Sequence, residues 1–345
     1  MSKIRVIVVD DSPLQRLVIS DILEKDSNID VIATAKDGME AFEKCRELKP
    51  DVITVDMEMP KYNGTWLIKR LMSECPIKVL IVSSLGNTNI QTILDALKIG
   101  AIDYISKPEK SKTSDIRDIG RDLISKVKAT YRSNLNEKFI KVNTNTNAHT
   151  FANDLPYEII AVGSSTGGPG ALESFISNLP GNLPLPIVIA QHMPANFVPS
   201  FVKRINSITP LDVFVGKEGM EISAGQVAVL NGEYNSVVLR RGNGRVTLGR
   251  SEESFRHFNN PSIDCLFNSV ANRFKGKSIG VILTGMGRDG GDGLLKMKNS
   301  GSFTIGQDES SCVVYGMPKY AFEIGAVTHQ VPLKQIGGFL VSSIS

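Results

Sequence analysis

Short apolar runs alternate with helical patterns over the first third of the chain, and this alternation constrains the fold more than any other feature. The runs resemble buried strands and cover residues 4–9, 31–33, 52–55, 79–83 and 102–105. Between them, segments such as residues 14–23 and 90–97 place apolar side chains three and four positions apart, as an amphipathic helix does. Five strand–helix units predict a doubly wound parallel sheet, with its site at the carboxyl ends of the strands.

The same alternation returns after about residue 157. Strand-like runs cover residues 158–162, 187–190, 279–283 and 303–305. Between Leu211 and Gly249 the pattern changes to short segments that Asn-Gly and Gly-Asn-Gly turns separate, at residues 227–230, 237–239 and 246–248. We therefore predict a second doubly wound, Rossmann-like α/β domain with a β-hairpin excursion from its main sheet.

A helix and a polar segment join the two alternating regions. Apolar residues at helical spacing run from Ile116 to Tyr131, which predicts a last helix packed on the first sheet. The sequence then loses its periodicity, and NTNTNAHT at residues 143–150 is typical of a flexible polar linker. We predict one domain over residues 1–125, a helix end and linker over 126–152, and a second domain over 153–345.

Composition excludes several classes of protein. The chain has 345 residues, 41% of them hydrophobic and 22% charged, as in ordinary globular proteins. No apolar run approaches the roughly 18–20 residues of a membrane span, and the first residues do not form a signal peptide. The four cysteines are widely spaced and form no CxxC pair, which argues against a disulfide framework or a structural zinc site. We therefore expect a cytoplasmic protein without direct membrane insertion.

The net charge of +3 is unevenly distributed along the chain. Residues 1–108 hold 14 basic and 16 acidic side chains, whereas residues 109–142 hold 9 basic and 5 acidic ones. The positive excess therefore lies mainly on the connecting helix, and the large C-terminal part is close to charge balance. A nucleic-acid-binding protein needs a concentrated basic face, so we expect no nucleic acid partner.

Polar side chains gather at the predicted carboxyl ends of the first sheet. They are Asp10 and Asp11 after the first strand, Asp56 after the third, Ser83 at the end of the fourth and Lys107 after the fifth. Three crowded carboxylates repel one another unless a hard cation neutralises them, so Mg²⁺ is the expected occupant. With the metal bound, one carboxylate can attack a phosphoryl group while a hydroxyl and an ammonium hold its oxygens. The alternative is that these acids only cap the helices that follow.

The stretch IIAVGSSTGGPG at residues 159–170 forms a polar end to the first strand of the second domain. Ser164 and Ser165 follow the apolar run, and a Gly-Gly-Pro sequence introduces a helix. A side chain on such a tight turn lies beside the free N–H groups of the coming helix. This position suits a nucleophilic serine and equally a bound phosphate, and the glycines alone do not separate the two.

Two further strands of this domain end in reactive side chains. QHMP at residues 191–194 contains His192, and TGMGRDGGDG at residues 284–293 contains Asp289. The carboxyl ends of parallel strands face one crevice, so a serine, a histidine and an acid can converge there for acyl transfer. Each residue also has a simpler explanation: Ser165 as a helix N-cap, His192 as a hydrogen-bonded core residue and Asp289 as a turn acid.

The first domain resembles the receiver domain of bacterial response regulators, which has a flavodoxin-like fold. Four motifs carry the resemblance: VVDDS at residues 8–12, DMEMP at 56–60, VSS at 82–84 and SKP at 106–108. The resemblance implies a full set of site residues: the phosphoacceptor Asp56, the Mg²⁺ ligands Asp10, Asp11, Asp56 and the backbone carbonyl of Glu58, and the switch residues Ser83, Tyr104 and Lys107. Tyr104 has an alternative explanation as an ordinary aromatic residue at a strand end.

The second domain resembles the catalytic domain of the chemotaxis protein-glutamate methylesterases. Five motifs carry the resemblance: GSSTGGPGAL at residues 163–172, QHMP at 191–194, PSID at 261–264, LTGMGRDG at 283–290 and DESSCVVYGMP at 308–318. It implies Ser165 as nucleophile, His192 as base, Asp289 as orienting acid, the N–H of Met286 as oxyanion donor and the Thr166 hydroxyl as support. Ser164 stands where the family often has alanine, and the segment from Ser251 to Asn260 is less familiar.

Together the two resemblances imply a phosphorylation-activated serine carboxyl-ester hydrolase. The expected reaction removes methyl groups from γ-glutamyl methyl esters of methyl-accepting chemoreceptors, with deamidation of receptor glutamines by the same acyl-enzyme route. A sensor histidine kinase would supply the phosphoryl group, and the unphosphorylated receiver would cover the active site.

Two other classes of output domain compete with this interpretation. One is a response regulator with a nucleotide-binding output, in which GSSTGGPG would hold a pyrophosphate, although no GxGxxG pattern is in register. The other is a DNA-binding regulator, which the long, strand-rich and nearly neutral second domain disfavours.

Overall fold

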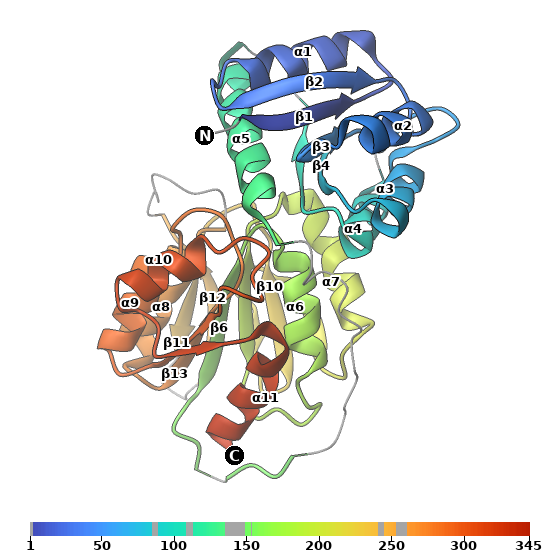
Figure 1. The fold of residues 1–345 in the computed structure, drawn as a ribbon. Helices are drawn as coiled ribbons and strands as arrows, with labels where there is room; N and C mark the ends of the chain where they lie inside the picture. Colours follow the sequence, from blue (N-terminus) through green and yellow to red (C-terminus); the bar gives the residue numbers. More distant parts are fainter. Residues whose placement is uncertain are drawn as a thin grey trace. The chain divides into compact units, whose positions relative to one another are not determined.

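The chain folds into two compact units, Met1–Phe139 and Ile140–Ser345, in a computed structural model (Figure 1). The structure describes residues 3–84, 89–107, 113–134, 149–152, 154–240, 245–252 and 261–345. Most of the predicted linker at residues 143–150 and of the segment from Ser251 to Asn260 therefore lies outside the described residues. In the part of the chain that is described, the helices are too short or too polar to cross a bilayer.

The first unit is built on a parallel sheet, as the alternation of apolar runs predicts. Its strands are β1 (Ile4–Val9), β2 (Ile29–Ala35), β3 (Val52–Val55), β4 (Lys78–Ser83) and β5 (Asp103–Ser106). They pair in parallel in the order β2–β1–β3–β4–β5. The chain thus starts in the interior of the sheet and builds outward on both sides, which places the carboxyl ends of β1 and β3 next to each other.

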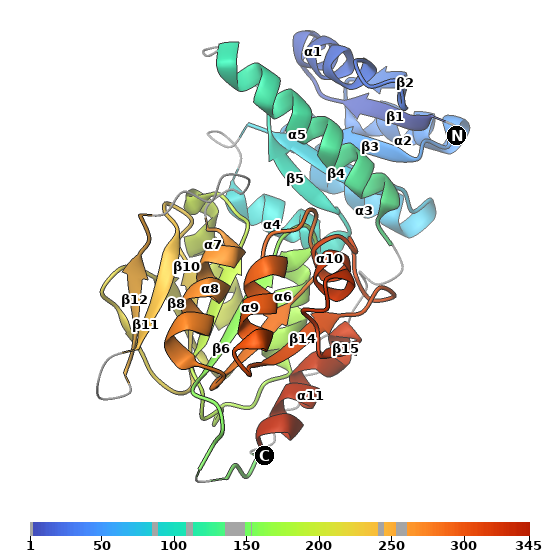
Figure 2. The same ribbon diagram turned by 90° about the vertical axis from the view of Figure 1, so that its left-hand side faces the viewer.

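Helices cover both faces of this sheet (Figures 1 and 2). They are α1 (Pro13–Glu24), α2 (Gly38–Leu48), α3 (Gly64–Glu74), α4 (Ile90–Ile99) and α5 (Thr113–Arg132). Four of them begin at a polar side chain, because an oxygen of Ser12, Asp37, Asn63 or Asn89 accepts a backbone N–H of the first turn. α1 contacts α5 on one face, and α2, α3 and α4 pack in succession on the other.

The second unit is built on a seven-stranded parallel sheet. Its strands are β6 (Ile159–Ser164), β7 (Ile187–Gln191), β8 (Asp212–Gly216), β10 (Gln226–Leu230), β13 (Ser278–Ile282), β14 (Phe303–Gln307) and β15 (His329–Val331). They pair in the order β15–β14–β13–β6–β7–β10–β8. From β6 the chain proceeds to β7 on one side and later to β13 on the other, so the connections reverse at β6 and open a crevice at its carboxyl end.

Helices also cover both faces of the larger sheet (Figure 2). They are α6 (Gly168–Ser177), α7 (Val198–Asn206), α8 (Ile263–Phe274), α9 (Gly291–Asn299), α10 (Met317–Glu323) and α11 (Leu333–Ile344). α8 packs on β6 and β13 and contacts α9 closely along its length. Ser262 begins α8, because its side chain accepts the backbone N–H of Cys265. The N-termini of α6, α8 and α9 therefore all belong to elements that pack around β6 and β13.

The doubly wound class of this unit is confirmed, but the predicted extent of the excursion was wrong. Residues 227–230 lie in β10 of the main sheet, where Val227 pairs with Ile187 of β7 and with Val213 of β8. Side chains from 227 to 230 are fully buried, as in a parallel strand that helices cover on both faces. The antiparallel excursion consists of β9 (Glu221–Ile222), β11 (Ser236–Arg240) and β12 (Val246–Arg250).

Candidate functional site

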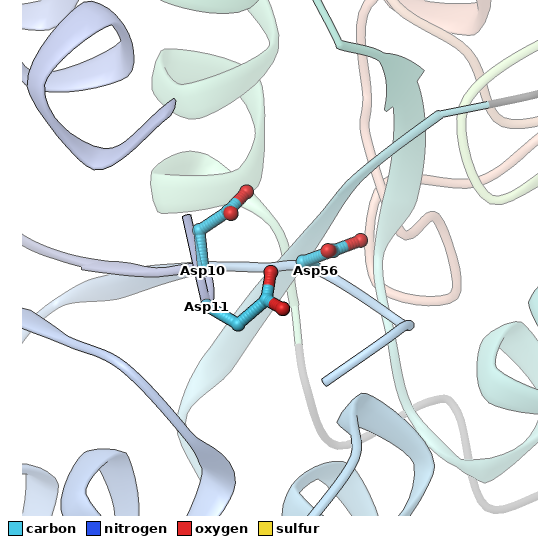
Figure 3. Close-up of side chains that lie close together, drawn as sticks. All are labelled: Asp10, Asp11 and Asp56. Atoms are coloured by element: carbon cyan, nitrogen blue, oxygen red, sulfur yellow. The ribbon is translucent and has the colours of Figure 1, made fainter. Parts of the chain in front are cut away.

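Three aspartates meet at the carboxyl ends of β1 and β3 in the first unit (Figure 3). Asp10 and Asp11 follow β1, and Asp56 follows β3. One carboxylate oxygen from each lies within 4.8 Å of the others. Asp10 and Asp56 are buried, whereas Asp11 is exposed. The cluster is therefore an arrangement of hard oxygen donors that is accessible from solvent on the Asp11 side.

Lys107 and Ser83 complete the surroundings of these carboxylates. The Nζ of Lys107, after β5, lies 2.7 Å from Oδ2 of both Asp10 and Asp56. The hydroxyl of Ser83, at the end of β4, donates to Oδ1 of Asp56 at 3.1 Å. Burial lowers the pKa of Lys107, but its hydrogen bonds to the two carboxylates outweigh burial and raise that pKa overall. Burial likewise raises the pKa of Asp10, although Lys107 opposes that effect.

Two further predicted residues of this unit lie nearby in sequence. Glu58 is two residues beyond Asp56, in the loop after β3, with an exposed side chain. Tyr104 lies in β5, where Ile81 of β4 is its neighbour across the sheet, and its ring is buried. Burial, with a smaller contribution from the charge of Asp103, raises the pKa of the Tyr104 hydroxyl. The structure thus brings five predicted residues together at four strand ends, and it places Tyr104 in β5, three residues before Lys107.

Ser165 lies on the tight turn between β6 and α6 in the second unit. β6 is buried along its whole length and ends at Ser164, whereas Ser165 is half-buried. Gly167 has a φ of 75°, in the left-handed region that favours glycine. A Cβ atom at Gly168 would lie 2.0 Å from Oε1 of Gln191, so only glycine fits there without displacing that side chain. These two glycines let the chain turn sharply into α6 and leave Ser165 at the tip of the strand.

His192 contacts both of the other residues predicted for the catalytic triad. It follows β7, next to β6 in the sheet, and its backbone N–H donates to the carbonyl of Ser164 at 3.0 Å. Its Nδ1 lies 3.1 Å from Oγ of Ser165, and its Nε2 lies 2.7 Å from Oδ2 of Asp289. A carboxylate only accepts, so Asp289 keeps the ring proton on Nε2, and the Nδ1 lone pair faces Ser165. The arrangement can transfer the Ser165 hydroxyl proton to the ring.

Asp289 is fully buried at the N-terminus of α8. Its Oδ1 accepts from the hydroxyl of Ser262 at 3.2 Å and from the N–H of Asp264 at 2.9 Å, and its Oδ2 accepts from the N–H of Ile263 at 2.8 Å. Free N–H groups and the partial positive charge of a helix N-terminus offset the burial of this carboxylate. Ser262 and Asp264 were not among the predicted site residues, although a serine before an apolar run is a recognisable N-cap signal.

Gln191 is a second residue whose role sequence analysis missed. Its Nε2 donates to the carbonyl oxygens of Ser165 at 3.0 Å and His192 at 2.9 Å, and its Oε1 accepts from the hydroxyl of Ser164 at 2.6 Å. Gln191 is 3% exposed and Ser164 is fully buried, so these bonds are shielded from water. The hydroxyl of Ser164 therefore supports Gln191. A position before a histidine gives no sign of where a glutamine side chain will point.

The loop after β13 lies against Ser165. The N–H of Ser165 donates to the carbonyl of Thr284 at 3.1 Å, and the hydroxyl of Thr284 donates to the carbonyl of Thr166 at 3.0 Å. A Cβ atom at Gly285 would lie 2.8 Å from Cβ of Ser165. Met286, the predicted oxyanion donor, is the next residue and is half-buried, while Thr166 is buried. Thr166 therefore belongs to the Ser165 turn itself, and Met286 directly follows Gly285, which lies against that turn.

Two family models match the chain, one for each unit. The model described as response regulator receiver domain matches residues 6–117, and the model described as CheB methylesterase matches residues 160–340. The two matches together include every residue predicted for the two sites.

Relatives match the chain over its whole length. A protein-glutamate methylesterase/protein-glutamine glutaminase of Sulfurimonas denitrificans is 44% identical over 350 residues, covering 99% of both chains. A protein of the same name from Thermotoga maritima is 37% identical and covers 99% of this chain and 98% of its own. The crystal structure of the Thermotoga maritima CheB methylesterase catalytic domain gives a TM-score of 0.53 at 37% identity, covering 55% of this chain and 99% of that one.

These similarities agree with the geometry of both sites. The alternative of a nucleotide-binding output is not supported, because the family model over residues 160–340 is that of a methylesterase. The Gly-rich turn also directs Ser165 to His192. The chain therefore belongs to the protein-glutamate methylesterase/protein-glutamine glutaminase family, in which a response regulator receiver domain precedes a CheB methylesterase domain.

Proposed function

We propose that this chain is a phosphorylation-activated protein-glutamate methylesterase, with Ser165 as nucleophile, His192 as general base and Asp289 as orienting acid. The observation that carries the proposal is the pair of contacts that His192 makes, with Ser165 through Nδ1 and with Asp289 through Nε2. The names of the relatives add protein-glutamine deamidation to the expected activity. The substrates we propose are γ-glutamyl methyl esters and selected glutamines of methyl-accepting chemoreceptors.

In the proposed acylation step, Oγ of Ser165 bonds to the ester carbonyl carbon as its proton passes to Nδ1 of His192. The carbonyl oxygen gains the negative charge and accepts the N–H of Met286, with the hydroxyl of Thr166 in support. Nδ1 then returns the proton to the departing methoxide oxygen, and methanol leaves. With a glutamine substrate the leaving group is ammonia. Attack by a water that gives its proton to Nδ1 releases the glutamate and restores Ser165.

For the first unit we propose Asp56 as the phosphoacceptor and Asp10, Asp11, Asp56 and the Glu58 backbone carbonyl as ligands of Mg²⁺. The close approach of three carboxylate oxygens supports a hard divalent cation there. When bound, the metal would neutralise charge on the phosphoryl oxygens.

The same strand ends supply partners for a phosphoryl group on Asp56. Ser83 and Lys107 already contact the Asp56 carboxylate, so their hydroxyl and ammonium can hold two phosphoryl oxygens. We propose that Ser83, Tyr104 and Lys107 form the switch that responds to phosphorylation, because they lie on the neighbouring strands β4 and β5 or directly after them.

We propose that the receiver spans residues 1–125, the helix end and linker 126–152 and the esterase 153–345, so that the receiver is covalently tethered to the site it restrains. A sensor histidine kinase is the proposed phosphodonor. Chemoreceptor signalling helices and this kinase meet in the cytoplasm, which is where we propose the chain acts. Among the described residues, the cysteines form no disulfide with one another, which fits a reducing compartment.

Two neighbouring serines provide a matched test of the triad. We expect Ser165→Ala to abolish methanol release from membranes that carry methylated chemoreceptors. Ser164→Ala should retain most of the activity, because the Ser164 hydroxyl bonds to Gln191 and not to His192. The opposite ranking would refute the assignment.

Adding acetyl phosphate and Mg²⁺ should activate the full chain but not Asp56→Asn, and equal responses of the two would end the proposed regulation.

A further inference from the structure

The segment DESSCVVYGMP at residues 308–318 has no part in the proposed acylation step, yet it lies against the loop that does. It leads from β14 into α10. The N–H of Gly285 donates to the carbonyl of Val314 at 3.1 Å, and the N–H of Met317 donates back to the carbonyl of Gly285 at 2.8 Å. The segment thus fixes the residue directly before Met286, the proposed oxyanion donor. We name residues 285–287 the oxyanion loop.

The same segment packs on the turn that carries the nucleophile. A Cβ atom at Gly167 would lie 2.5 Å from Cβ of Val313, so Val313 packs closely over Gly167. Gly167 is two residues after Ser165, in the turn between β6 and α6. One segment therefore contacts both parts of the site that must be aligned for acyl transfer, the nucleophile turn and the oxyanion loop.

Thr284 is the residue at which these parts of the chain meet. It is fully buried, two residues after β13, and its carbonyl accepts the N–H of Ser165 at 3.1 Å. Its hydroxyl accepts the N–H of Val314 at 2.9 Å and donates to the carbonyl of Thr166 at 3.0 Å. The carbonyl of Val314 lies 3.2 Å from the same hydroxyl, as a second acceptor. Thr284 therefore joins the Ser165 turn to the 308–318 segment.

Gln307 holds Thr284 from the side of β14. Its side chain is fully buried, and its Oε1 accepts the N–H of Thr284 at 2.8 Å. Its Nε2 donates to the carbonyl of Ser311 at 2.7 Å, and the hydroxyl of Ser311 accepts the N–H of Leu333, the first residue of α11, at 2.9 Å. Because these bonds are shielded from water, they fix the position of Thr284 firmly.

The bond from Ser165 to Thr284 also determines which groups can stabilise the oxyanion. An N–H that already donates to a carbonyl is not available to a developing negative charge. The N–H of Ser165 is in that situation, so the donors have to come from elsewhere, which agrees with the proposed role of Met286. The position of the oxyanion loop relative to Oγ of Ser165 then decides how well the charge is stabilised, and Thr284 connects the two.

We propose that Thr284 is a positioning residue of the esterase, whose hydroxyl holds the Ser165 turn and the 308–318 segment so that the oxyanion loop meets the nucleophile. This inference rests on the proposed roles of Ser165 and Met286. Because Thr284 is fully buried, it acts through its neighbours and not on the substrate itself. Its contribution therefore belongs to the transition state, where the alignment of donors matters most, and not to substrate binding.

Thr284→Val keeps the shape of the side chain but removes the hydroxyl that bonds to Thr166 and Val314. In methanol release by the full chain with acetyl phosphate and Mg²⁺, we expect kcat to fall about 10- to 100-fold and KM to stay within about twofold. Thr284→Ser restores the hydroxyl and should recover kcat to within about threefold of the wild type. A Thr284→Ser chain as slow as Thr284→Val, or a change confined to KM, would overturn the proposal.

Thr304→Val is the matched control. Thr304 is also fully buried, and its hydroxyl donates to the carbonyl of Ala326 at 2.7 Å and accepts the N–H of Thr328 at 3.0 Å. These partners precede β15, on the side of β14 away from β6. Urea denaturation should show similar losses of stability for the two valine variants, and Thr304→Val should keep the wild-type kcat. Equal falls in kcat would show that Thr284 acts only through stability and would overturn the proposal.

A further variant keeps the test independent of how Thr284→Val folds. Thr284→Cys places a thiol, a weaker donor and acceptor, where Thr284→Ser has a hydroxyl, so its kcat should be about fivefold below that of Thr284→Ser. Equal kcat values for these two variants would overturn the proposal.

The proposed function and this inference fail differently in these experiments. Equal activity of wild type and Ser165→Ala would refute the proposed function. An active wild type, an inactive Ser165→Ala and a Thr284→Val chain with the wild-type kcat would refute this inference alone.

Discussion

Replacing Gln191 with leucine removes the amide that holds the tips of β6 and β7 together. Leucine fills a similar volume but forms no hydrogen bond, so three bonds disappear at once. The hydroxyl of Ser164 and the carbonyl of His192 lose the partner described above. The carbonyl of Ser165 keeps the N–H of Gly168 at 2.7 Å. The backbone bond from His192 to Ser164 also remains, so we expect the unit to fold with a displaced turn.

The magnitude follows from these lost bonds. Leaving a buried polar group unsatisfied costs roughly 1–3 kcal/mol, and two groups lose their partner fully. Burying the apolar leucine side chain recovers about 1–2 kcal/mol. We therefore expect the free energy of unfolding to fall by about 2.5 kcal/mol, the midpoint of the two contributions. Because Gln191 binds the backbone of both Ser165 and His192, a shift between them should lower kcat about 10- to 100-fold, with little change in KM.

Urea denaturation and the kinetics of methanol release measure the two effects separately. Ser164→Ala is the control, since it removes one of the three bonds and should cost about 1 kcal/mol and less than about threefold in kcat. A Gln191→Leu chain that loses stability as expected but keeps the wild-type kcat would show that the amide does not position the catalytic pair. A chain as stable as the wild type would refute the energetic reasoning itself.

Two other substitutions test the remaining contacts. Lys107→Met leaves the buried carboxylates of Asp10 and Asp56 without their cation, so the free energy of unfolding of the receiver should fall by about 3–5 kcal/mol at neutral pH. This loss should shrink on acidification and on adding Mg²⁺. Thermal melts of the full chain in a pH and Mg²⁺ series measure it, and a loss of stability that depends on neither would contradict this reasoning. Gly285→Ala would place a Cβ 2.3 Å from Sδ of the buried Met317 and 2.8 Å from Cβ of Ser165, so the loop has to shift away from both residues. We expect kcat to fall about 100-fold while phosphorylation of the receiver is unchanged, and near-normal methanol release would contradict the placement of this loop.

Much of the fold was predictable because the strands of both units are buried on two faces. A parallel strand under two helix layers becomes a short, continuous apolar run, as in β1 and β6, and such runs are visible without any knowledge of pairing. The order of strands within a sheet is not encoded in that signal. Residues 227–230 therefore looked like part of a hairpin, because turns flank them, although their side chains occupy the interior of the main sheet.

The candidate site was predictable where strand ends carry it. Ser165, His192 and Asp289 follow β6, β7 and β13, and the parallel topology alone is enough to bring such residues to one edge. The groups that fix their orientation were not predictable in the same way. Ser262 and Asp264 come from a helix that starts far away in sequence, and their role depends on which helix N-terminus packs against the Asp289 loop.

Each unit buries two carboxyl groups side by side, and the two units offset the resulting repulsion differently. In the receiver, Lys107 forms ion pairs with both Asp10 and Asp56, so its positive charge offsets their repulsion. A metal ion can replace the ammonium beside the carboxylates, and a phosphoryl group on Asp56 can become its new partner. In the esterase, Asp289 and Asp264 accept backbone N–H groups at the N-termini of two helices. A lysine side chain can move to a new partner, whereas backbone N–H groups at a helix N-terminus are fixed by the helix. The first arrangement therefore suits a response to phosphorylation, and the second holds the carboxylate that contacts His192 in one position.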